Sequence, residues 1–155
     1  MSVSVRPVLA ADRERWSALY AGYRAFYALL DDPEAVDTTW HWVSTGEHGI
    51  TGLVAVDDTA GSSDLLGLAN VRRFARPSSA TTGLYLDDLF TDPAARGRGV
   101  ATALLHEAGA LAAREGASVV RWITSADNAT ARRVYDRVAA ATPWVTYDLV
   151  PGRDR

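Results

Sequence analysis

The sequence predicts a mixed α/β fold, in which helices pack on one central sheet. Two observations lead to this prediction. Apolar residues recur at helical spacing in residues 12–30 and again from residue 100, and several short runs between them are rich in β-branched residues. The chain has 155 residues and is 48% hydrophobic, which is enough for one sizeable core. We therefore expect a single domain that spans residues 1–155, without a linker or an internal repeat.

The N-terminal third is predicted to hold one strand and two helices. Residues 3–8 alternate with β-branched residues, which is typical of a short strand. Residues 12–30 form an amphipathic helix whose apolar face is unusually aromatic. An Asp-Asp-Pro segment interrupts it, and a second helix is expected over residues 34–45.

Three strands are predicted in the middle of the chain. Residues 49–57 and 65–74 are apolar runs of strand length, and the polar residues 58–64 join them as a hairpin loop. A loop rich in proline, serine and threonine follows, and residues 84–91 form the next strand.

The C-terminal third continues the alternation of helix and strand. Apolar residues at 100–112 give the next helix its buried stripe, and residues 118–124 form a strand rich in β-branched residues. Asp127 or Asn128 caps another helix, and residues 144–150 are predicted as the last strand.

Composition excludes several classes of function. The net charge of -3 argues against a general nucleic-acid binder, which would carry a basic stripe. Without cysteine there are no disulfides, thiolate metal sites or cysteine-linked acyl intermediates. His41, His48 and His106 lack the spacing of metal ligands. No apolar run can span a membrane and the N-terminus lacks a signal layout, so we expect a cytoplasmic protein with no metal and with no membrane or nucleic-acid partner.

The segment from residue 92 to 102 has the features of an anion site. Backbone N–H groups at the start of a helix are unpaired and point the same way, and the helix dipole adds positive charge there. Gly97 and Gly99 let an anion approach this backbone closely, while Arg96 and Arg98 can meet phosphate oxygens at its rim.

Two other phosphate motifs do not fit this turn. A P-loop requires a lysine after its second glycine, and the chain has no lysine. A dinucleotide fingerprint requires a third small residue where Thr102 stands, and an acid on the strand at 118–124 where none occurs. A tight turn into a helix, with no ligand, remains the alternative for Gly97 and Gly99 taken alone.

The longer pattern Arg96-x-x-Gly99-x-Ala101 resembles the [Q/R]-x-x-G-x-[G/A] signature of the GNAT superfamily of acyl-CoA-dependent N-acetyltransferases. Residues 85–93 resemble the strand before that signature, and residues 128–135 resemble its later N-x-x-A-x-x-x-Y segment. The resemblance implies a central, mostly antiparallel sheet that is splayed between its fourth and fifth strands and flanked by about four helices.

Within the superfamily, the acid pair Asp87-Asp88 and the segment 122–124 are most similar to the branch of polyamine, thialysine and yeast histone/polyamine acetyltransferases. The resemblance implies acetyl-CoA as the acyl donor. The residues implied to contact it lie on the strand, the signature and the later helix: Leu89, Phe90, Thr91, Arg96, Gly97, Arg98, Gly99, Val100, Ala101, Thr102, Asn128 and Arg132.

Acetyl transfer requires an uncharged amine, and because an alkyl ammonium has a pKa of about 10, a base must remove its proton. Alternation along the strand at 84–91 puts Asp87 and Asp88 on opposite faces, so only one carboxylate is expected to face the acetyl group. Resemblance to the polyamine branch makes Asp87 the water-mediated base, and Asp88 would then hold a cationic substrate or brace the sheet. The backbone N–H of Leu89 is implied as the donor to the acetyl carbonyl.

Tyr135 lies about two helical turns beyond Asn128, so the two side chains should share a helix face. The resemblance implies that Tyr135 protonates the departing thiolate of CoA. Asn128 suits the helix N-cap, and a contact with the CoA arm is implied by the family alone.

The acceptor site is predicted from aromatic residues of the first two helices, among which Tyr27 and Trp40 are our candidates for substrate contact beside Asp88. We expect acetyl transfer from acetyl-CoA to the primary amine of a small molecule, such as a polyamine or an amino acid, by direct attack in a ternary complex. A protein lysine or N-terminal acetyltransferase, or a catalytically silent acyl-CoA sensor, is the alternative. The sequence leaves the choice between monomer and homodimer open.

Overall fold

The computed structural model describes residues 2–59 and 64–152, so the predicted hairpin loop at 58–64 lies partly outside the described residues. Contacts within the chain divide it into two units, Met1–Thr124 and Ser125–Arg155. Within the described residues, no helix is both long enough and apolar enough to cross a lipid bilayer.

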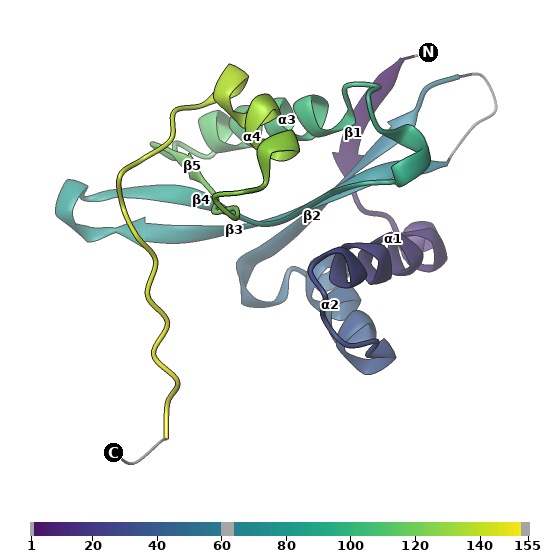
Figure 1. Ribbon diagram of the computed structural model, residues 1–155, viewed down its shortest axis with the longest axis horizontal. Helices are drawn as coiled ribbons and strands as arrows, with labels where there is room; N and C mark the ends of the chain where they lie inside the picture. Colours follow the sequence, from purple (N-terminus) through teal and green to yellow (C-terminus); the bar gives the residue numbers. More distant parts are fainter. Residues whose placement is uncertain (1, 60–63, 153–155) are drawn as a thin grey trace. The chain divides into compact units, whose positions relative to one another are not determined.

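The first unit is built on a five-stranded sheet with the strand order β1-β2-β3-β4-β5 (Figure 1). The first four strands are antiparallel to their neighbours, and β5 is parallel to β4. This confirms the predicted mixed sheet. The strands are β1 (Val3–Pro7), β2 (Ile50–Asp57), β3 (Leu65–Arg76), β4 (Thr81–Thr91) and β5 (Val120–Arg121).

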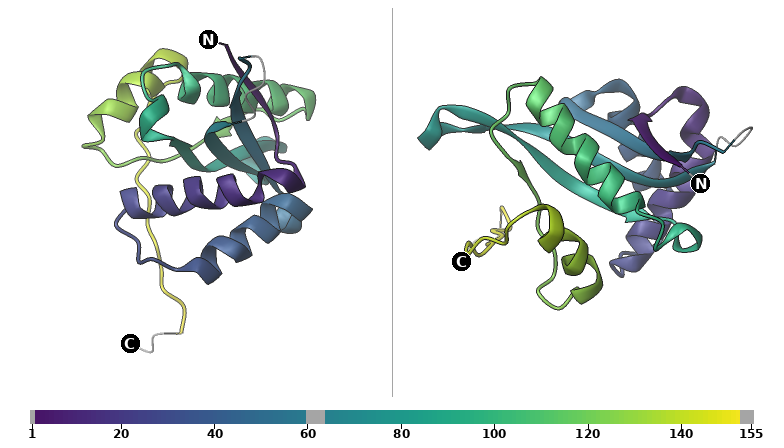
Figure 2. Two further views of the ribbon diagram at one scale, coloured as in Figure 1. Left: turned by 90° about the vertical axis from the view of Figure 1, so that its right-hand side faces the viewer. Right: turned by 90° about the horizontal axis from the view of Figure 1, so that it is seen from above.

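Helices cover both faces of this sheet (Figure 2). Helices α1 (Arg13–Phe26) and α2 (Pro33–Thr45) pack on one face, and α3 (Val100–Arg114) packs on the other. The helical periodicity read from the sequence is thus confirmed for all three helices, because each buries its apolar stripe against the sheet. The core on the face of α1 and α2 contains Trp16, Leu19, Tyr20, Val36, Trp40, Val43, Val54, Leu65, Leu68 and Phe90.

α1 ends at Phe26, one turn before the predicted end at residue 30. Ala28 adopts a left-handed conformation with φ 54°, and the N–H of Leu29 donates to the carbonyl of Arg24 at 3.0 Å. The left-handed residue and this hydrogen bond end the helix, and glycine is the residue that usually occupies such a position. No residue type at this position indicates the stop, because alanine is otherwise a strong helix former.

β5 is much shorter than the predicted strand at 118–124. Its pairing with β4 consists of Leu84 with Val120 and Tyr85 with Arg121. Past Tyr85, the edge of β4 that faces away from β3 has no paired strand within the described residues. The sheet therefore opens between β4 and β5, which confirms the predicted splay.

β4 contains an extra residue relative to β3. Asn70 lies opposite Asp88, whereas the next residue of β3, Val71, lies opposite Leu86. Asp87 is thus the additional residue of a β-bulge. The unbroken alternation predicted along residues 84–91 is wrong, because a bulge changes which face the following side chains occupy.

The second unit holds α4 (Ala129–Val138), which begins at the predicted N-cap. The side chain of Asn128 accepts a hydrogen bond from the N–H of Ala131 at 3.4 Å. The predicted strand at 144–150 is wrong: the structure shows no strand there. Alternating apolar residues favour an extended chain, but a strand also requires a hydrogen-bonded neighbour, which a single-sequence pattern does not specify.

Candidate active site

The bulge brings both carboxylates of β4 to one face of the sheet. Asn70 and Arg72 are two residues apart on β3, so their side chains lie on the same face. Asn70 Nδ2 donates to Asp88 Oδ2 at 2.9 Å, and Arg72 Nε donates to Asp87 Oδ2 at 2.9 Å. The prediction that Asp87 and Asp88 occupy opposite faces is therefore wrong, because the extra residue interrupts the alternation.

Asp87 is a partly shielded carboxylate with one arginine partner. Its side chain is 32% exposed, and burial raises the pKa of its carboxyl group above the ordinary value. The guanidinium of Arg72 acts in the opposite direction, and the negative charge of Asp88 adds to the rise in pKa. Arg72 also lies over the ring of Tyr85, 4.7 Å from its centroid, which fixes the guanidinium in place.

Asp88 is held by neutral donors. Besides Asn70, the hydroxyl of Tyr20 lies 3.4 Å from Asp88 Oδ2. Burial and the charge of Asp88 raise the pKa of Tyr20 to about 12 and also raise the pKa of Tyr23, so both hydroxyls keep their protons. Among the described residues, no arginine or histidine forms an ion pair with Asp88. Within the part of the chain that the structure describes, this face of β4 therefore presents one carboxylate without a cationic partner.

The aromatic residues of α1 lead from the core toward these carboxylates. The rings of Trp16 and Tyr20 stack at 4.8 Å between centroids, and those of Tyr20 and Tyr23 stack at 5.5 Å. Tyr23 in turn contacts Tyr27, whose ring centroid is 4.9 Å away. Tyr27 is 43% exposed, so it can meet a bound molecule, and the negative charge of Asp88 adds to the rise that burial causes in its pKa.

Trp40, the other predicted substrate contact, belongs to the core. It is 6% exposed, and its ring packs on Trp16 at 5.3 Å between centroids. The prediction that Trp40 contacts the substrate is therefore wrong, because α1 and the sheet bury the indole on the inner face of α2.

The last residues of β4 lie on its open edge. Phe90 is 8% exposed and packs in the core, and its side chain also lines a cavity next to α1. Leu89 and Thr91 are half-buried. This stretch lies beyond the end of the β4–β5 ladder, so its backbone groups on that edge have no strand to pair with among the described residues.

The glycine turn has the geometry that the sequence predicted for an anion cradle. Gly97 and Gly99 have φ values of 76° and 80°, which other residues rarely adopt, and a Cβ at either position would meet no atom within 4 Å. Gly99 is the N-cap of α3 and offers no side chain to it, and the N–H of Ala103 is bonded to the Gly99 carbonyl at 2.9 Å. The first helical N–H groups, from Val100 to Thr102, therefore have no intrahelical partner.

The two arginines of the turn play different parts. Arg98 Nη2 lies 2.9 Å from Asp57 Oδ2 at the end of β2, so this guanidinium ties the turn to the sheet. Arg96 lies over the ring of Phe26, with its guanidinium carbon 5.8 Å from the centroid. Arg96 is exposed, so it is the more available of the two for a phosphate.

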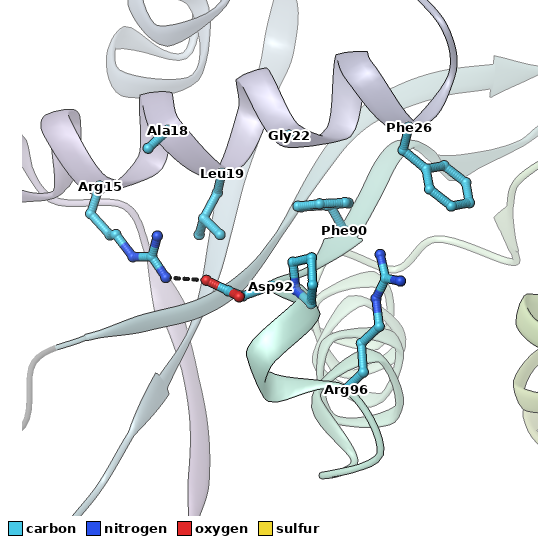
Figure 3. A pocket seen from close by; sticks show the side chains of 9 residues that line it. Arg15, Ala18, Leu19, Gly22, Phe26, Phe90, Asp92 and Arg96 are labelled. Carbon is cyan, nitrogen blue, oxygen red and sulfur yellow. Dashed lines mark hydrogen bonds and ion pairs between the residues drawn. The ribbon is translucent and has the colours of Figure 1, made fainter.

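A second brace holds the start of the turn. Asp92 accepts from the N–H of Ala94 at 2.8 Å, and Arg15 Nη2 of α1 donates to the Asp92 carboxylate (Figure 3). The hydrogen bond from Arg15 lowers the pKa of Asp92, so the pair stays ionised. Arg15 Nη2 also donates to the carbonyl of Leu65 at 3.2 Å. The end of β4 is thus fixed to both α1 and β3.

A cavity of about 250 Å³ lies between α1 and this brace. Figure 3 shows Phe26 and Arg96 at one end and the pair of Arg15 and Asp92 at the other. Gly22 of α1 faces its floor, where a Cβ would lie 3.1 Å from Phe90 Cε1. A larger residue at this position would push α1 away from β4.

The remaining predicted site residues lie on α4. Asn128 and Tyr135 are both half-buried on one face of this helix, at the predicted spacing of two turns. Arg132 Nη1 donates to the carbonyl of Ala126 at 2.7 Å, which fixes the loop before the helix. Their roles in catalysis and CoA contact stay predictions.

The sequence did not point to Asn70 or Arg72. Asn70 is the one polar side chain in the buried run 65–71 of β3. A single polar residue in an apolar run could have indicated it, because a fully buried polar residue requires hydrogen-bond partners. Arg72 had no comparable signal, since its pairing with Asp87 depends on the bulge. Among the described residues, no group of three or more metal-binding side chains occurs.

Comparison with known proteins identifies the family and the fold. The model of the acetyltransferase (GNAT) family matches residues 16–140, which include parts of both units of the chain. The D-amino-acid N-acetyltransferase HPA3 of Saccharomyces cerevisiae is 27% identical over 145 residues, which cover 94% of this chain and 89% of that protein.

Solved structures agree at the level of the fold. A ribosomal-protein-alanine N-acetyltransferase from Brucella melitensis is similar with a TM-score of 0.79 at 19% identity, covering 97% of this chain and 100% of that chain. An aminoglycoside N-acetyltransferase, AAC(6')-Iy, in complex with CoA is similar with a TM-score of 0.80 at 17% identity. The match covers 97% of this chain and 96% of that chain. The chain belongs to the acetyltransferase (GNAT) family and is an acetyl-CoA-dependent N-acetyltransferase.

Proposed function

We propose that the protein transfers the acetyl group of acetyl-CoA to the primary amine of a small molecule, by direct attack within a ternary complex. The observation that carries this proposal is the pair of carboxylates that the bulge places on one face of β4, next to the strand's open edge. Asp88, which has no cationic partner among the described residues, would bind the incoming ammonium group. Its neighbour Asp87 would receive a proton from that group through water.

The donor side of the proposal rests on the glycine turn. The unpaired N–H groups at the start of α3, together with the helix dipole, would hold the diphosphate of acetyl-CoA. The open space above Gly97 and Gly99 leaves room for it, and Arg96 would contribute a charged hydrogen bond. The pantetheine arm would then follow Leu89, Phe90 and Thr91 along the backbone of the open edge of β4, and Asn128 and Arg132 would contact it from α4.

The chemical step follows from these positions. With its proton removed, the amine nitrogen attacks the thioester carbon, while the N–H of Leu89 stabilises the oxygen as it becomes negative. The carbon–sulfur bond then breaks, and Tyr135 supplies a proton to the sulfur. The nitrogen loses its second proton as the amide forms, and that proton would return through water to the tyrosinate, which restores Tyr135. A carboxylate with a raised pKa is a better proton acceptor than an ordinary one, which fits the environment of Asp87.

The acceptor class is supported by the relatives and by the charges at the site. HPA3 is by its name an acetyltransferase of D-amino acids, and AAC(6')-Iy is one of aminoglycosides. An amino acid would need a cation for its carboxylate. Arg72 lies beside Asp87 and is 40% exposed, so it would supply that cation. We therefore propose amino acids first and other small amines second.

Substitution of Gly99 tests the cradle. Gly99→Leu is expected to weaken acetyl-CoA binding at least about tenfold, because the side chain would occupy the space next to the helical N–H groups. The measurement is the thermal stabilisation of the protein by acetyl-CoA. Gly116→Leu is the matched control, since Gly116 also has a positive φ and open space but lies at the other end of α3. Equal loss of binding in both variants would contradict the assignment.

A panel of amines tests the acceptor. Release of the CoA thiol is expected with at least one small primary amine from a set of D- and L-amino acids, polyamines, aminoglycosides and alanine-terminated peptides. For that amine, Asp88→Asn should raise KM about tenfold or more, because a charged contact is lost. Asp37→Asn, on an exposed ion pair of α2, should leave KM unchanged. Turnover of peptides alone, or acetyl-CoA binding without thiol release, would refute the proposed acceptor.

The pH profile tests Asp87 as the base. Asp87 acts only when ionised, so kcat/KM falls as the pH drops through its pKa. Because Arg72 lowers that pKa, Arg72→Met should move this acid limb to higher pH with the same amine. Arg73→Met is the matched control, because Arg73 pairs with Glu115 instead. An acid limb at the same pH in Arg72→Met and the parent enzyme would exclude Asp87 as the titrating base.

Removal of one hydroxyl tests the general acid. Tyr135→Phe should lower kcat about a hundredfold, because the thiolate would leave without a proton donor. Thermal stabilisation by acetyl-CoA should be retained. Tyr147→Phe, which alters an exposed tyrosine beyond α4, serves as the control. Unchanged turnover in Tyr135→Phe would show that another group protonates the sulfur.

A further inference from the structure

Asn70 is a polar side chain buried inside the sheet, at the point where β4 bulges. It is 2% exposed, and it lies in a run of β3 whose other side chains are buried and, apart from a glycine, apolar. Its backbone partner across the ladder is Asp88. This residue is not among those assigned to the proposed reaction.

Among the described residues, only one of the two polar atoms of the Asn70 side chain has a hydrogen-bond partner. Its Nδ2 donates to Asp88 Oδ2 at 2.9 Å, whereas its buried Oδ1 has no partner among the described residues. A buried polar atom without a partner lowers the stability of a fold, and an apolar side chain of similar size would avoid that cost. The requirements of the fold alone therefore do not explain an asparagine at this position.

The contact with Asp88 offers an explanation. Two tyrosines of α1 make longer contacts nearby. The hydroxyl of Tyr20 lies 3.4 Å from Asp88 Oδ2, and the hydroxyl of Tyr23 lies 3.4 Å from the backbone carbonyl of Asp87. The shortest hydrogen bond to Asp88 thus comes from Asn70, a residue held in the middle of the sheet between β2 and β4. A donor fixed in this way restricts the rotamer of the carboxylate.

We propose that Asn70 is a positioning residue, which holds the Asp88 carboxylate aimed at the acceptor amine, and which is kept at this place at the expense of stability. This inference rests on the proposed role of Asp88 in binding the amine. It predicts that replacement of Asn70 by an apolar residue weakens amine binding but does not lower the stability of the fold. This is expected where a residue serves the site at a cost in stability.

The decisive variant is Asn70→Leu, which has a similar volume and no polar atoms. Its melting temperature should equal or exceed that of the parent protein, while KM for the amine rises about tenfold and KM for acetyl-CoA stays the same. Val71→Ala is the matched control on the same strand and the opposite face. It should lower the melting temperature by opening a cavity, and it should leave KM for the amine unchanged. If Asn70→Leu does not accumulate as folded protein, Asn70→Ala carries the same comparison of KM values.

A double-variant cycle separates positioning from an independent effect. If Asn70 acts through Asp88, adding Asn70→Leu to Asp88→Asn should cause no further rise in KM for the amine. Multiplication of the two effects would overturn the inference, as would a normal KM in Asn70→Leu or an equal rise in KM for acetyl-CoA. An unchanged KM in Asp88→Asn alone would instead refute the proposed function of Asp88, so the two failures are distinguishable.

Discussion

An extra residue in β4, Asp87, interrupts the ladder with β3 and sets the geometry of the site. Without it, alternation would send Asp87 and Asp88 to opposite faces of the sheet. With it, both carboxylates reach side chains that β3 presents on one face, Asn70 and Arg72. Just before the bulge, the pairing of β4 with β5 ends at Tyr85. The two acids and the free strand edge therefore occur on the same few residues.

The proposed acetyl-CoA site depends on a turn that is fixed at both of its ends. The pair of Arg15 and Asp92 holds its start against α1 and β3, and the pair of Arg98 and Asp57 holds its glycines against β2. These ion pairs are partly exposed, so each stabilises the fold only modestly. Their effect is geometric: they keep the unpaired N–H groups of α3 beside the open edge of β4. The proposed acetyl-CoA cradle is thus preorganised by the unit that also carries the acid pair.

The sequence predicted the order of the elements from β1 to α4 and the glycine turn, because each depends on local periodicity or on a residue type with one dominant role, and the family resemblance implied the splayed sheet. It also predicted a strand at 144–150 that the structure does not contain. It missed the stop of α1 at Ala28 and the bulge at Asp87, since nothing in either residue announces a departure from regular geometry. It also placed Trp40 in the acceptor site, because an aromatic residue on a helix looks the same in a core and in a pocket. Local sequence patterns do not predict contacts between strands, such as the hydrogen bond from Asn70 to Asp88.

The central claim is that both carboxylates of the bulge serve one acceptor amine. A crystal structure of the protein with a bisubstrate analogue, in which CoA is joined to the best amine found, tests it most directly. We predict the amine nitrogen on the face of β4 that bears Asn70 and Arg72, in hydrogen-bond contact with Asp88 and one water molecule away from Asp87. A nitrogen on the opposite face, beside Leu86 and Val71, would contradict the account.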